Sequence, residues 1–162
     1  MMKASKDAVT LIKHFEGCRL KAYPDPGSKD GSPWTIGYGH TGKEVTKGLA
    51  WTQAQADAAL AGDVARFACD VEKLIKVSVT QGQFDALVSF AYNIGVGALA
   101  SSTLLRLLSS GSFSGAARQF ERWDKQDGRP RLGLSRRRRA ERLLFETSDI
   151  NLAIAEAAKL KR

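Results

Sequence analysis

The sequence predicts an α+β fold: a small lobe with a short antiparallel sheet, a long connecting helix and a larger helical lobe. Three observations lead to this prediction. Apolar residues recur at helical spacing in most of the chain. Residues 14–40 instead combine turn-forming residues with β-branched and aromatic ones. The length of 162 residues lies in the single-domain range, and a hydrophobic content of 43% is enough for a substantial core.

We therefore expect residues 1–162 to form one domain with a cleft between its two lobes. The predicted parts are a sheet lobe over 16–50, a connecting helix over 52–76, a helical lobe from 1–15 and 77–147, and an accessory C-terminal helix over 148–162.

The first predicted helix ends at a carboxylate. Four apolar residues between Ala8 and Phe15 have the i, i+3, i+4, i+7 spacing of an amphipathic helix, and Gly17 is the residue type that most readily ends one. Glu16 is therefore in the last turn, at the negative end of the helix dipole. This position, and any burial against Phe15, disfavours ionisation, as a general acid requires.

A second carboxylate follows nine residues later, in a different setting. Asp25 lies between Pro24 and Pro26 in a turn-rich segment, so we expect it to be exposed and ionised. One protonated and one ionised carboxyl group form the pair that cleaves glycosidic bonds. Thr35, at the start of the strand-forming run that follows, is placed to hold a water molecule beside Asp25.

These residues resemble the phage-type lysozymes, the endolysins of glycoside hydrolase family 24. The resemblance is carried by FEG at 15–17, by Asp25 and by TIGYGH at 35–40, and it extends to TQGQFDALVSFAYNIGVGALASSTLLRLL and GLSRRRRAERLLF. It implies a lysozyme-like fold with Glu16, Asp25 and Thr35 as catalytic residues. The loop between Asp25 and Thr35 is longer than in the best-known members and contains a second acid, Asp30.

The resemblance also implies an activity and a structural pair. The activity is hydrolysis of the β-1,4 bond between N-acetylmuramic acid and N-acetylglucosamine in bacterial peptidoglycan, without a cofactor or metal, for lysis of the host cell. The pair is His40 with an aspartate on the next long helix, for which Asp63 is the candidate; such a partner raises the pKa of His40.

The distance between the carboxyl groups of Glu16 and Asp25 decides the stereochemical outcome. A separation of roughly 6.5–9.5 Å would predict inversion at the anomeric carbon, and a separation near 5 Å would predict retention.

The connecting helix begins at a capping-box sequence, Thr52 followed by Gln55, and carries apolar residues at helical spacing from Leu60 to Leu74. The same capping sequence recurs at Thr80, before a helix that ends at Tyr92 and Asn93. Those last two residues have two interpretations: they line the cleft and bind substrate, or Tyr92 is core and Asn93 caps the turn.

Three shorter helices are predicted in the remainder of the helical lobe. They span Ser102–Ser109, Ser114–Trp123 and Arg136–Phe145, the last with Ser135 as its N-cap. The apolar stripes of the first two, at Leu104, Leu105, Leu108, Ala117, Phe120 and Trp123, are expected to pack inward as scaffold.

The net charge of +8 predicts attraction to a polyanion, and residues 111–162 contribute 13 basic and 7 acidic residues. The run Arg136–Arg139 is the strongest signal for nucleic acid, but consecutive helical residues point in different directions. We interpret it as a solvated face, with Glu141 paired to Arg137 or Arg138, and predict no nucleic-acid partner. The alternatives are an arginine-rich nucleic-acid module and a basic tail that disrupts anionic membranes without chemistry.

The predicted location rests on the absence of signal-peptide and membrane-span patterns from the sequence, and the predicted thiol state on its two cysteines. The N-terminus has no apolar region or cleavage site typical of a signal peptide, and no stretch approaches the length of a membrane span. We expect a monomer that stays in the host cytoplasm until a holin-made lesion releases it to the cell wall, with the tail able to touch an anionic outer membrane. Cys18 and Cys69 are expected to remain thiols.

Overall fold

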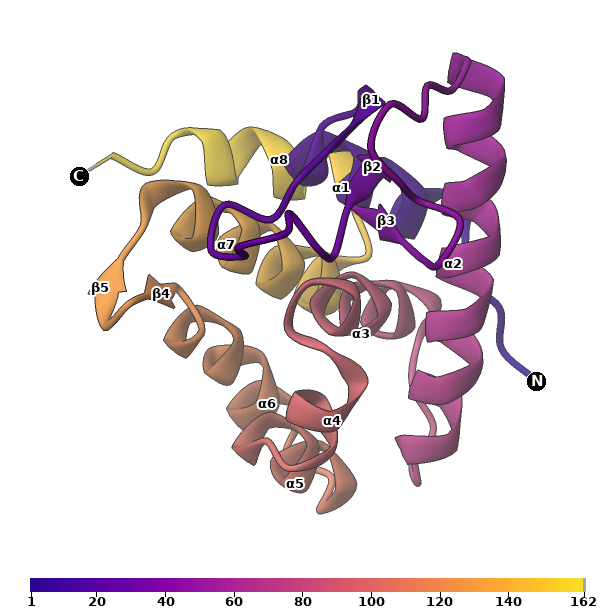
Figure 1. Cartoon of the computed structure of the whole chain (residues 1–162). Helices are drawn as coiled ribbons and strands as arrows, with labels where there is room; N and C mark the ends of the chain where they lie inside the picture. Colours follow the sequence, from indigo (N-terminus) through magenta and orange to yellow (C-terminus); the bar gives the residue numbers. More distant parts are fainter. Residues whose placement is uncertain (162) are drawn as a thin grey trace.

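The computed structural model describes residues 1–161 as an α+β fold, with a small sheet beside one long helix and a group of helices on its other side (Figure 1). The predicted fold class is confirmed. In chain order the first elements are α1 (Lys6–Glu16), β1 (Arg19–Tyr23), β2 (Thr35–Gly37), β3 (His40–Thr41), α2 (Gln53–Leu74) and α3 (Gln81–Ile94). They are followed by α4 (Val96–Ala100), α5 (Thr103–Ser109), α6 (Phe113–Gln119), the 3₁₀ turn η1 (Phe120–Arg122), β4 (Lys125–Gln126), β5 (Arg129–Pro130), α7 (Leu132–Thr147) and α8 (Ile150–Ala158).

Side chains cap the predicted helix starts. Thr52 and Gln55 form a reciprocal capping box at the start of α2, and Thr80 with Gln83 does the same for α3. Each box satisfies two backbone N–H groups that the first helical turn leaves without partners. At the other end of α1, Gly17 adopts a φ of 66° and ends the helix directly after Glu16.

The sheet is antiparallel in the order β1-β2-β3, with Tyr23 opposite Thr35 and Ile36 opposite His40. Ile36 is fully buried, so this side chain anchors the sheet to the rest of the molecule. Gly37 at the end of β2 and Gly39 in the turn before β3 have φ of 65° and 87°. Both values lie in the left-handed region that glycine adopts most readily, so the tight return of the chain depends on these residues.

The core is built around α3, whose side chains Phe84, Leu87 and Phe90 are fully buried. Helix α7 packs against α3 and α8 packs against α7, which puts the C-terminal helix on the outside of the helical group (Figure 1). Phe90 and Phe120 make an edge-to-face contact with ring centroids 5.1 Å apart. The predicted scaffold residues Leu104, Leu105, Leu108, Ala117 and Phe120 are buried, and Trp123 is partly buried against the same core.

The segment from α6 to α7 differs from the predictions. Helix α7 begins at Leu132 rather than Arg136, and Ser135 is inside it, donating to Asp124 Oδ2 at 3.0 Å instead of capping. The predicted helix Ser114–Trp123 is divided into α6 and η1. The loop before α7 also contains the β4–β5 hairpin, which the sequence analysis missed. Strands of two residues show no alternation of apolar and polar side chains that a sequence pattern could reveal.

The solvated-face interpretation of Arg136–Arg139 is wrong for its two central members. Arg137 is 3% exposed and Arg138 is fully buried. Glu141, also fully buried, accepts hydrogen bonds from both guanidinium groups, and the Arg138 guanidinium lies over the Phe90 ring at 4.9 Å from its centroid. An internal carboxylate and an aromatic face replace the water that these charges would otherwise require.

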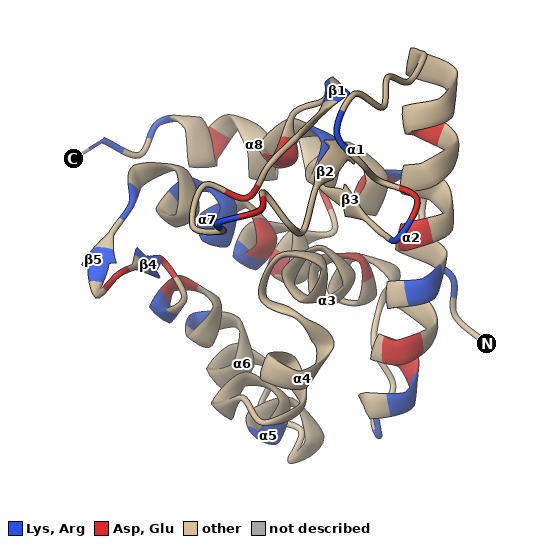
Figure 2. Ribbon diagram, viewed as in Figure 1, with Lys and Arg blue, Asp and Glu red and all other residues tan. Residues whose placement is uncertain are grey.

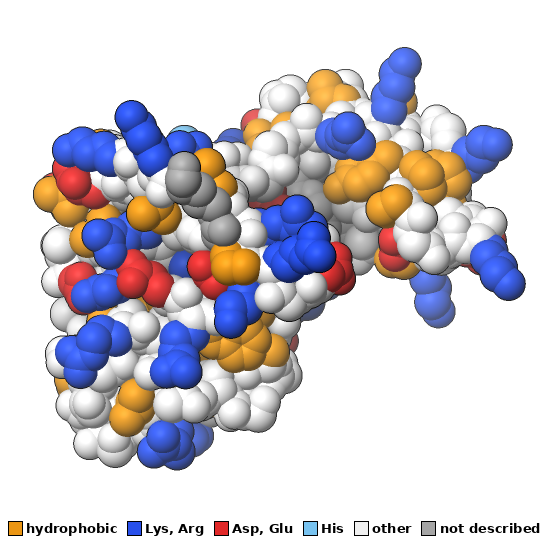
Figure 3. All heavy atoms as spheres, turned by 90° about the vertical axis from the view of Figure 1, so that its left-hand side faces the viewer, with side chains coloured by type: hydrophobic (Ala, Val, Ile, Leu, Met, Phe, Trp, Pro, Cys, Tyr) orange, Lys and Arg blue, Asp and Glu red, His pale blue; other side chains and the backbone are white. Residues whose placement is uncertain are grey.

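Lys and Arg residues are frequent on β5, α7 and the C-terminal segment (Figure 2). The space-filling view of that face shows these side chains spread widely, with acidic groups between many of them (Figure 3). Cys18 and Cys69 are both exposed and free. Within residues 1–161, no helix has both the length and the apolar character needed to cross a bilayer.

Candidate active site

Glu16 lies on the wall of an open groove of about 410 Å³. The groove is lined by Phe15 and Glu16 from α1, Asn93 from α3, Gln126 and Arg131 from the hairpin region, and Gly133, Leu134 and Arg137 from α7. Because Glu16 is the last residue of α1, its side chain projects where the helix ends. The side chain is 22% exposed, which leaves the carboxyl group accessible from the groove.

Arg137 is the direct partner of Glu16 and was missed as a site residue by the sequence analysis. Its Nη1 donates to Glu16 Oε1 at 2.5 Å, its Nη2 donates to the Ser89 carbonyl oxygen at 3.2 Å, and its Nε donates to Glu141 Oε1 at 3.2 Å. The guanidinium therefore connects α1, α3 and α7 through three separate nitrogen atoms. The only sequence signal was the i, i+4 spacing of Arg137 and Glu141.

Glu141 binds two further side chains besides Arg137. It accepts hydrogen bonds from Ser89 Oγ at 2.8 Å and from Arg138 Nη2 at 3.0 Å, in addition to Arg137. Arg138 Nε also lies 2.8 Å from Glu141 Oε2, as an ion pair without hydrogen-bond alignment. Burial lowers the pKa of the Arg138 guanidinium, and the negative charge of Glu141 opposes that effect.

The glycine turn of the sheet lies near Glu16 Oε2, whereas Arg137 contacts Glu16 Oε1. A Cβ atom at Gly39 would lie 3.5 Å from Glu16 Oε2 and 3.9 Å from the Tyr92 hydroxyl oxygen. The Tyr92 hydroxyl donates to the Tyr38 carbonyl oxygen at 2.6 Å, and burial raises the pKa of Tyr92. Tyr92 thus joins α3 to the sheet turn, whereas Asn93 is exposed and lines the groove.

Asp25 and Thr35 lie outside the lining of the Glu16 groove. Asp25 is exposed, and its Oδ1 accepts a hydrogen bond from the Gly27 N–H at 2.9 Å. Thr35 is half-buried at the first position of β2. The additional acid of the loop, Asp30, accepts from Ser28 Oγ at 2.7 Å and from the Ser32 N–H at 2.9 Å, and these bonds lower the pKa of Asp30.

His40 lies between two carboxylates. Its Nδ1 is 2.6 Å from Asp63 Oδ2, and its Nε2 is 2.6 Å from Glu44 Oε1. Burial by itself lowers the pKa of His40, but the hydrogen bonds to Glu44 and Asp63 outweigh it, so the net direction is upward. Asp63 also accepts from Arg66 Nη2 at 3.2 Å. These contacts tie β3 to α2.

The stability of the protein is expected to fall as pH rises through the raised pKa of His40. A folded-state pKa above the ordinary value of about 6.5 means that the protonated histidine contributes stability fully below pH ~6.5. That contribution disappears once the folded-state imidazolium is deprotonated. Chemical denaturation of wild type and His40→Gln should therefore give a larger difference in free energy of unfolding at pH 6 than at pH 9. A difference independent of pH would contradict the proposed charge on His40.

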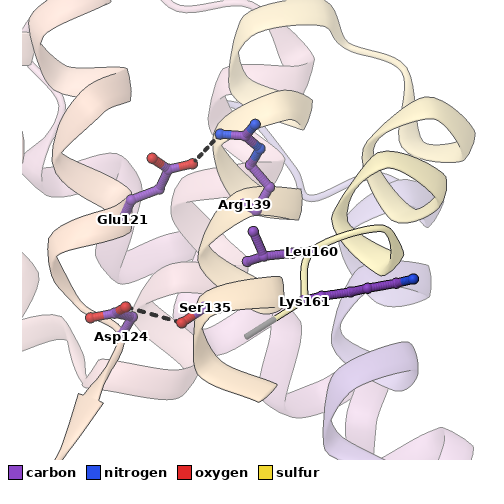
Figure 4. A pocket seen from close by; sticks show the side chains of 6 residues that line it. All are labelled: Glu121, Asp124, Ser135, Arg139, Leu160 and Lys161. Carbon is purple, nitrogen blue, oxygen red and sulfur yellow. Dashed lines mark hydrogen bonds and ion pairs between the residues drawn. The ribbon is translucent and has the colours of Figure 1, made fainter. Parts of the chain in front are cut away.

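A second hollow, of about 380 Å³, lies between η1, α7 and the C-terminal segment (Figure 4). Within it Arg139 Nη1 donates to Glu121 Oε1 at 2.7 Å, and Ser135 donates to Asp124. Arg136 Nε donates to the Leu160 carbonyl oxygen at 3.1 Å, which attaches the tail to α7. The four arginines of the run thus all have hydrogen-bond acceptors within the protein.

Comparison with known proteins places this chain in one protein family. Residues 13–141 match the family model described as phage lysozyme. The chain is 46% identical over 160 residues to an endolysin of Bacillus phage B103, covering 99% of this chain and 60% of that protein. It is 42% identical over 151 residues to an endolysin of Acyrthosiphon pisum secondary endosymbiont phage 1, covering 91% of this chain and 100% of that protein.

A solved structure gives the same result at the level of the fold. The muramidase domain of SpmX from Asticaccaulis excentricus superimposes with a TM-score of 0.82 and 38% identity, covering 91% of this chain and 99% of that one. The chain spans 60% of the length of the endolysin from Bacillus phage B103 and 56% of the length of the one from Bacillus phage PZA.

Proposed function

Because the chain belongs to the phage lysozyme family, we propose that it is an endolysin-type muramidase that hydrolyses the β-1,4 bond between N-acetylmuramic acid and N-acetylglucosamine in peptidoglycan. The observation that carries this proposal is the position of Glu16. Glu16 is the last residue of α1, and its side chain lines an open groove. The buried Arg137 donates a hydrogen bond to its carboxyl group. A carboxyl group held in one orientation can meet the glycosidic oxygen of a bound glycan.

Glu16 is proposed to act as the general acid that protonates the leaving oxygen. Asp25, with Thr35, is proposed to activate the attacking water. Asp25 is preferred over Asp30 because both hydrogen bonds made by the Asp30 carboxylate shape its own loop. Asp25 accepts only one such bond among the described residues, so more of its carboxylate remains available.

Three further roles complete the proposal. Asn93 is assigned to substrate binding, since its exposed amide lines the groove beside Glu16. Tyr92 is assigned to holding the sheet turn in place, through its hydrogen bond to Tyr38. His40 and Asp63 are proposed to act as a structural pair that joins β3 to α2.

The alternative functions have less support. A nucleic-acid site at Arg136–Arg139 requires guanidinium groups that are free to reach phosphates, but Arg137 and Arg138 are buried and Arg139 is paired with Glu121. A membrane-disrupting tail requires a continuous exposed apolar face, but Ala153 and Ala157 of α8 are buried and Leu152 is its only exposed large apolar side chain. We infer a monomer that reaches the cell wall through a holin-made lesion, with at most a contact between its tail and an anionic outer membrane.

Analysis of the products of purified peptidoglycan tests the proposed reaction. Mass spectrometry of the digest is expected to find fragments that end in reducing N-acetylmuramic acid, because water is the proposed acceptor. An anhydro end would show transfer to the muramic acid itself and would contradict hydrolysis. Fragments ending in reducing N-acetylglucosamine would place the cut at the other glycosidic bond.

A further inference from the structure

Tyr38, in the glycine turn (residues 37–39), is held at both ends by contacts that the proposed reaction does not use. Its side chain is 8% exposed. Its hydroxyl oxygen accepts from Gln53 Nε2 at 2.9 Å, and the same hydroxyl donates to Asp57 Oδ1 at 3.3 Å. Its carbonyl oxygen accepts from the Tyr92 hydroxyl at 2.6 Å. One buried residue therefore joins the turn to α2 through its side chain and to α3 through its backbone.

The same polar cluster reaches the helix that carries Glu16. Lys13, one turn before Glu16 in α1, donates to Asp57 Oδ1 at 3.0 Å. Its ammonium group also lies 5.3 Å from the centroid of the Tyr38 ring. The hydrogen bond from Lys13 lowers the pKa of Asp57, and burial raises the pKa of Tyr38. The acceptor therefore stays ionised and the tyrosine hydroxyl stays neutral, as the hydrogen bond between them requires.

The backbone on both sides of Tyr38 does little to fix the turn. Gly37 and Gly39 flank it with φ of 65° and 87°. Because glycine adopts many backbone conformations at low cost, these two residues permit the turn without restraining it. The restraint comes instead from the hydroxyl and carbonyl contacts of Tyr38. Loss of the hydroxyl contacts is expected to widen the range of positions of the turn while the ring stays packed in the core.

The position of the turn matters because it borders one oxygen of Glu16. A Cβ atom at Gly39 would lie 3.5 Å from Glu16 Oε2, whereas Oε1 accepts from Arg137 Nη1. In a protonated carboxyl group, the oxygen that accepts from a guanidinium acts as the carbonyl oxygen. The proton of the proposed acid therefore lies on Oε2, the oxygen beside the glycine turn.

We propose that Tyr38 is a positioning residue: its hydroxyl, bound to two residues of α2, fixes the glycine turn beside Glu16 Oε2 and so keeps the proton donor in its productive orientation. This inference rests on the proposed function. Tyr38 is outside the lining of the groove beside Glu16, so it acts through the turn and not on the glycan. Proton transfer needs the donor within about 2.6–3.2 Å of the glycosidic oxygen, so a small displacement of the turn slows the chemical step.

The test uses Tyr38→Phe and Asp57→Asn, singly and together. Tyr38→Phe removes only the hydroxyl group and keeps the ring and the backbone carbonyl. Asp57→Asn removes the charge from the acceptor on α2. The matched control is Asp70→Asn on the same helix. Asp70 also pairs with a lysine at 3.0 Å, and its side chain is 42% exposed, against 44% for Asp57.

Release of reducing ends from purified wall is measured well below the thermal transition of each variant. Tyr38→Phe is expected to lower kcat by roughly three- to tenfold, as for one lost hydrogen-bonded group, with KM within about twofold of wild type. The double variant should lose no more than the larger single loss, because both changes break the same network. Asp70→Asn should match wild type.

Amide hydrogen exchange provides a readout that does not depend on activity. Exchange at residues 37–40 should be faster in Tyr38→Phe and in Asp57→Asn than in wild type, because the turn opens more often. Exchange in the middle of α3 should not change, and Asp70→Asn should leave the turn at the wild-type rate.

Four results would overturn the inference. They are a wild-type kcat in folded Tyr38→Phe, a loss confined to KM, losses that multiply in the double variant, and a fall in kcat without faster exchange at the turn. The second would make Tyr38 a determinant of glycan binding, and the third would show that its hydroxyl and Asp57 act separately. A wild-type protein that releases no reducing ends would reject the proposed hydrolase itself, whereas any of these four results in an active enzyme would reject only the role of Tyr38.

Discussion

Replacement of Glu16 by Gln is expected to lower the rate of peptidoglycan hydrolysis by about 10²–10⁴-fold, the range typical for loss of a general acid. The amide keeps the shape of the side chain and an oxygen that can accept from Arg137, but it cannot supply a proton to the leaving oxygen. Because the substituted group acts on the bond being broken, kcat should fall far more than KM rises. Release of reducing ends from purified wall measures the effect.

The matched control for this change is Glu156→Gln, which removes the same charge from the exposed surface of α8. It should hydrolyse wall at the wild-type rate. Both variants must show the thermal transition of a folded protein. A Glu16→Gln variant that is folded and still clears wall would contradict the proposed reaction and would favour a mechanism based on binding, since neither the basic surface nor the tail is altered.

Replacement of Glu141 by Gln is expected to lower the free energy of unfolding by about 3–5 kcal/mol, as for a buried ion pair that loses one partner. Glu141 is fully buried and binds both Arg137 and Arg138. Without its charge, two guanidinium groups remain inside the protein. Arg138 already has an Nη1 without a hydrogen-bond partner in the described part of the chain. Denaturant titration measures the loss.

The same substitution is expected to lower kcat in protein that remains folded. Glu141 Oε1 accepts from Arg137 Nε, and Arg137 Nη1 donates to Glu16 Oε1. With a neutral amide at position 141 the guanidinium loses its charged partner on α7, so the Glu16 carboxyl group is held less firmly in the orientation that meets the glycosidic oxygen. Release of reducing ends from purified wall, assayed well below the thermal transition of the variant, should show a fall in kcat with little change in KM.

Glu146→Gln is the control on the same helix. Glu146 pairs with Arg142 at the four-residue spacing, but its side chain is 35% exposed. An exposed pair of this kind contributes only about 0.3–0.5 kcal/mol, so stability and kcat should both stay close to the wild-type values. If Glu141→Gln destabilised the protein but left kcat of the folded variant unchanged, Glu141 would support the fold without positioning Arg137 against Glu16.

The local sequence was sufficient to predict the helix ends, which interactions between neighbouring residues determine. Thr52 with Gln55 and Thr80 with Gln83 form the capping boxes at the predicted helix starts, and Gly17 ends α1 directly after Glu16. These features involve residues one to four positions apart, so their sequence patterns carry the information needed to predict them. The fold class followed in the same way, because the spacing of apolar residues indicates which face of each helix is buried.

What the sequence alone determined was therefore the order of the elements, the position of Glu16 at a helix end and the resemblance to phage-type lysozymes. Only the tertiary structure decided that Arg137 contacts Glu16, 121 residues earlier in the chain, and that Arg138 is buried beside Glu141. A run of arginines has the same local pattern on a solvated helix as on one packed against α3. The difference arises from the packing of α1, α3 and α7 around one buried carboxylate, which no interaction between neighbouring residues specifies.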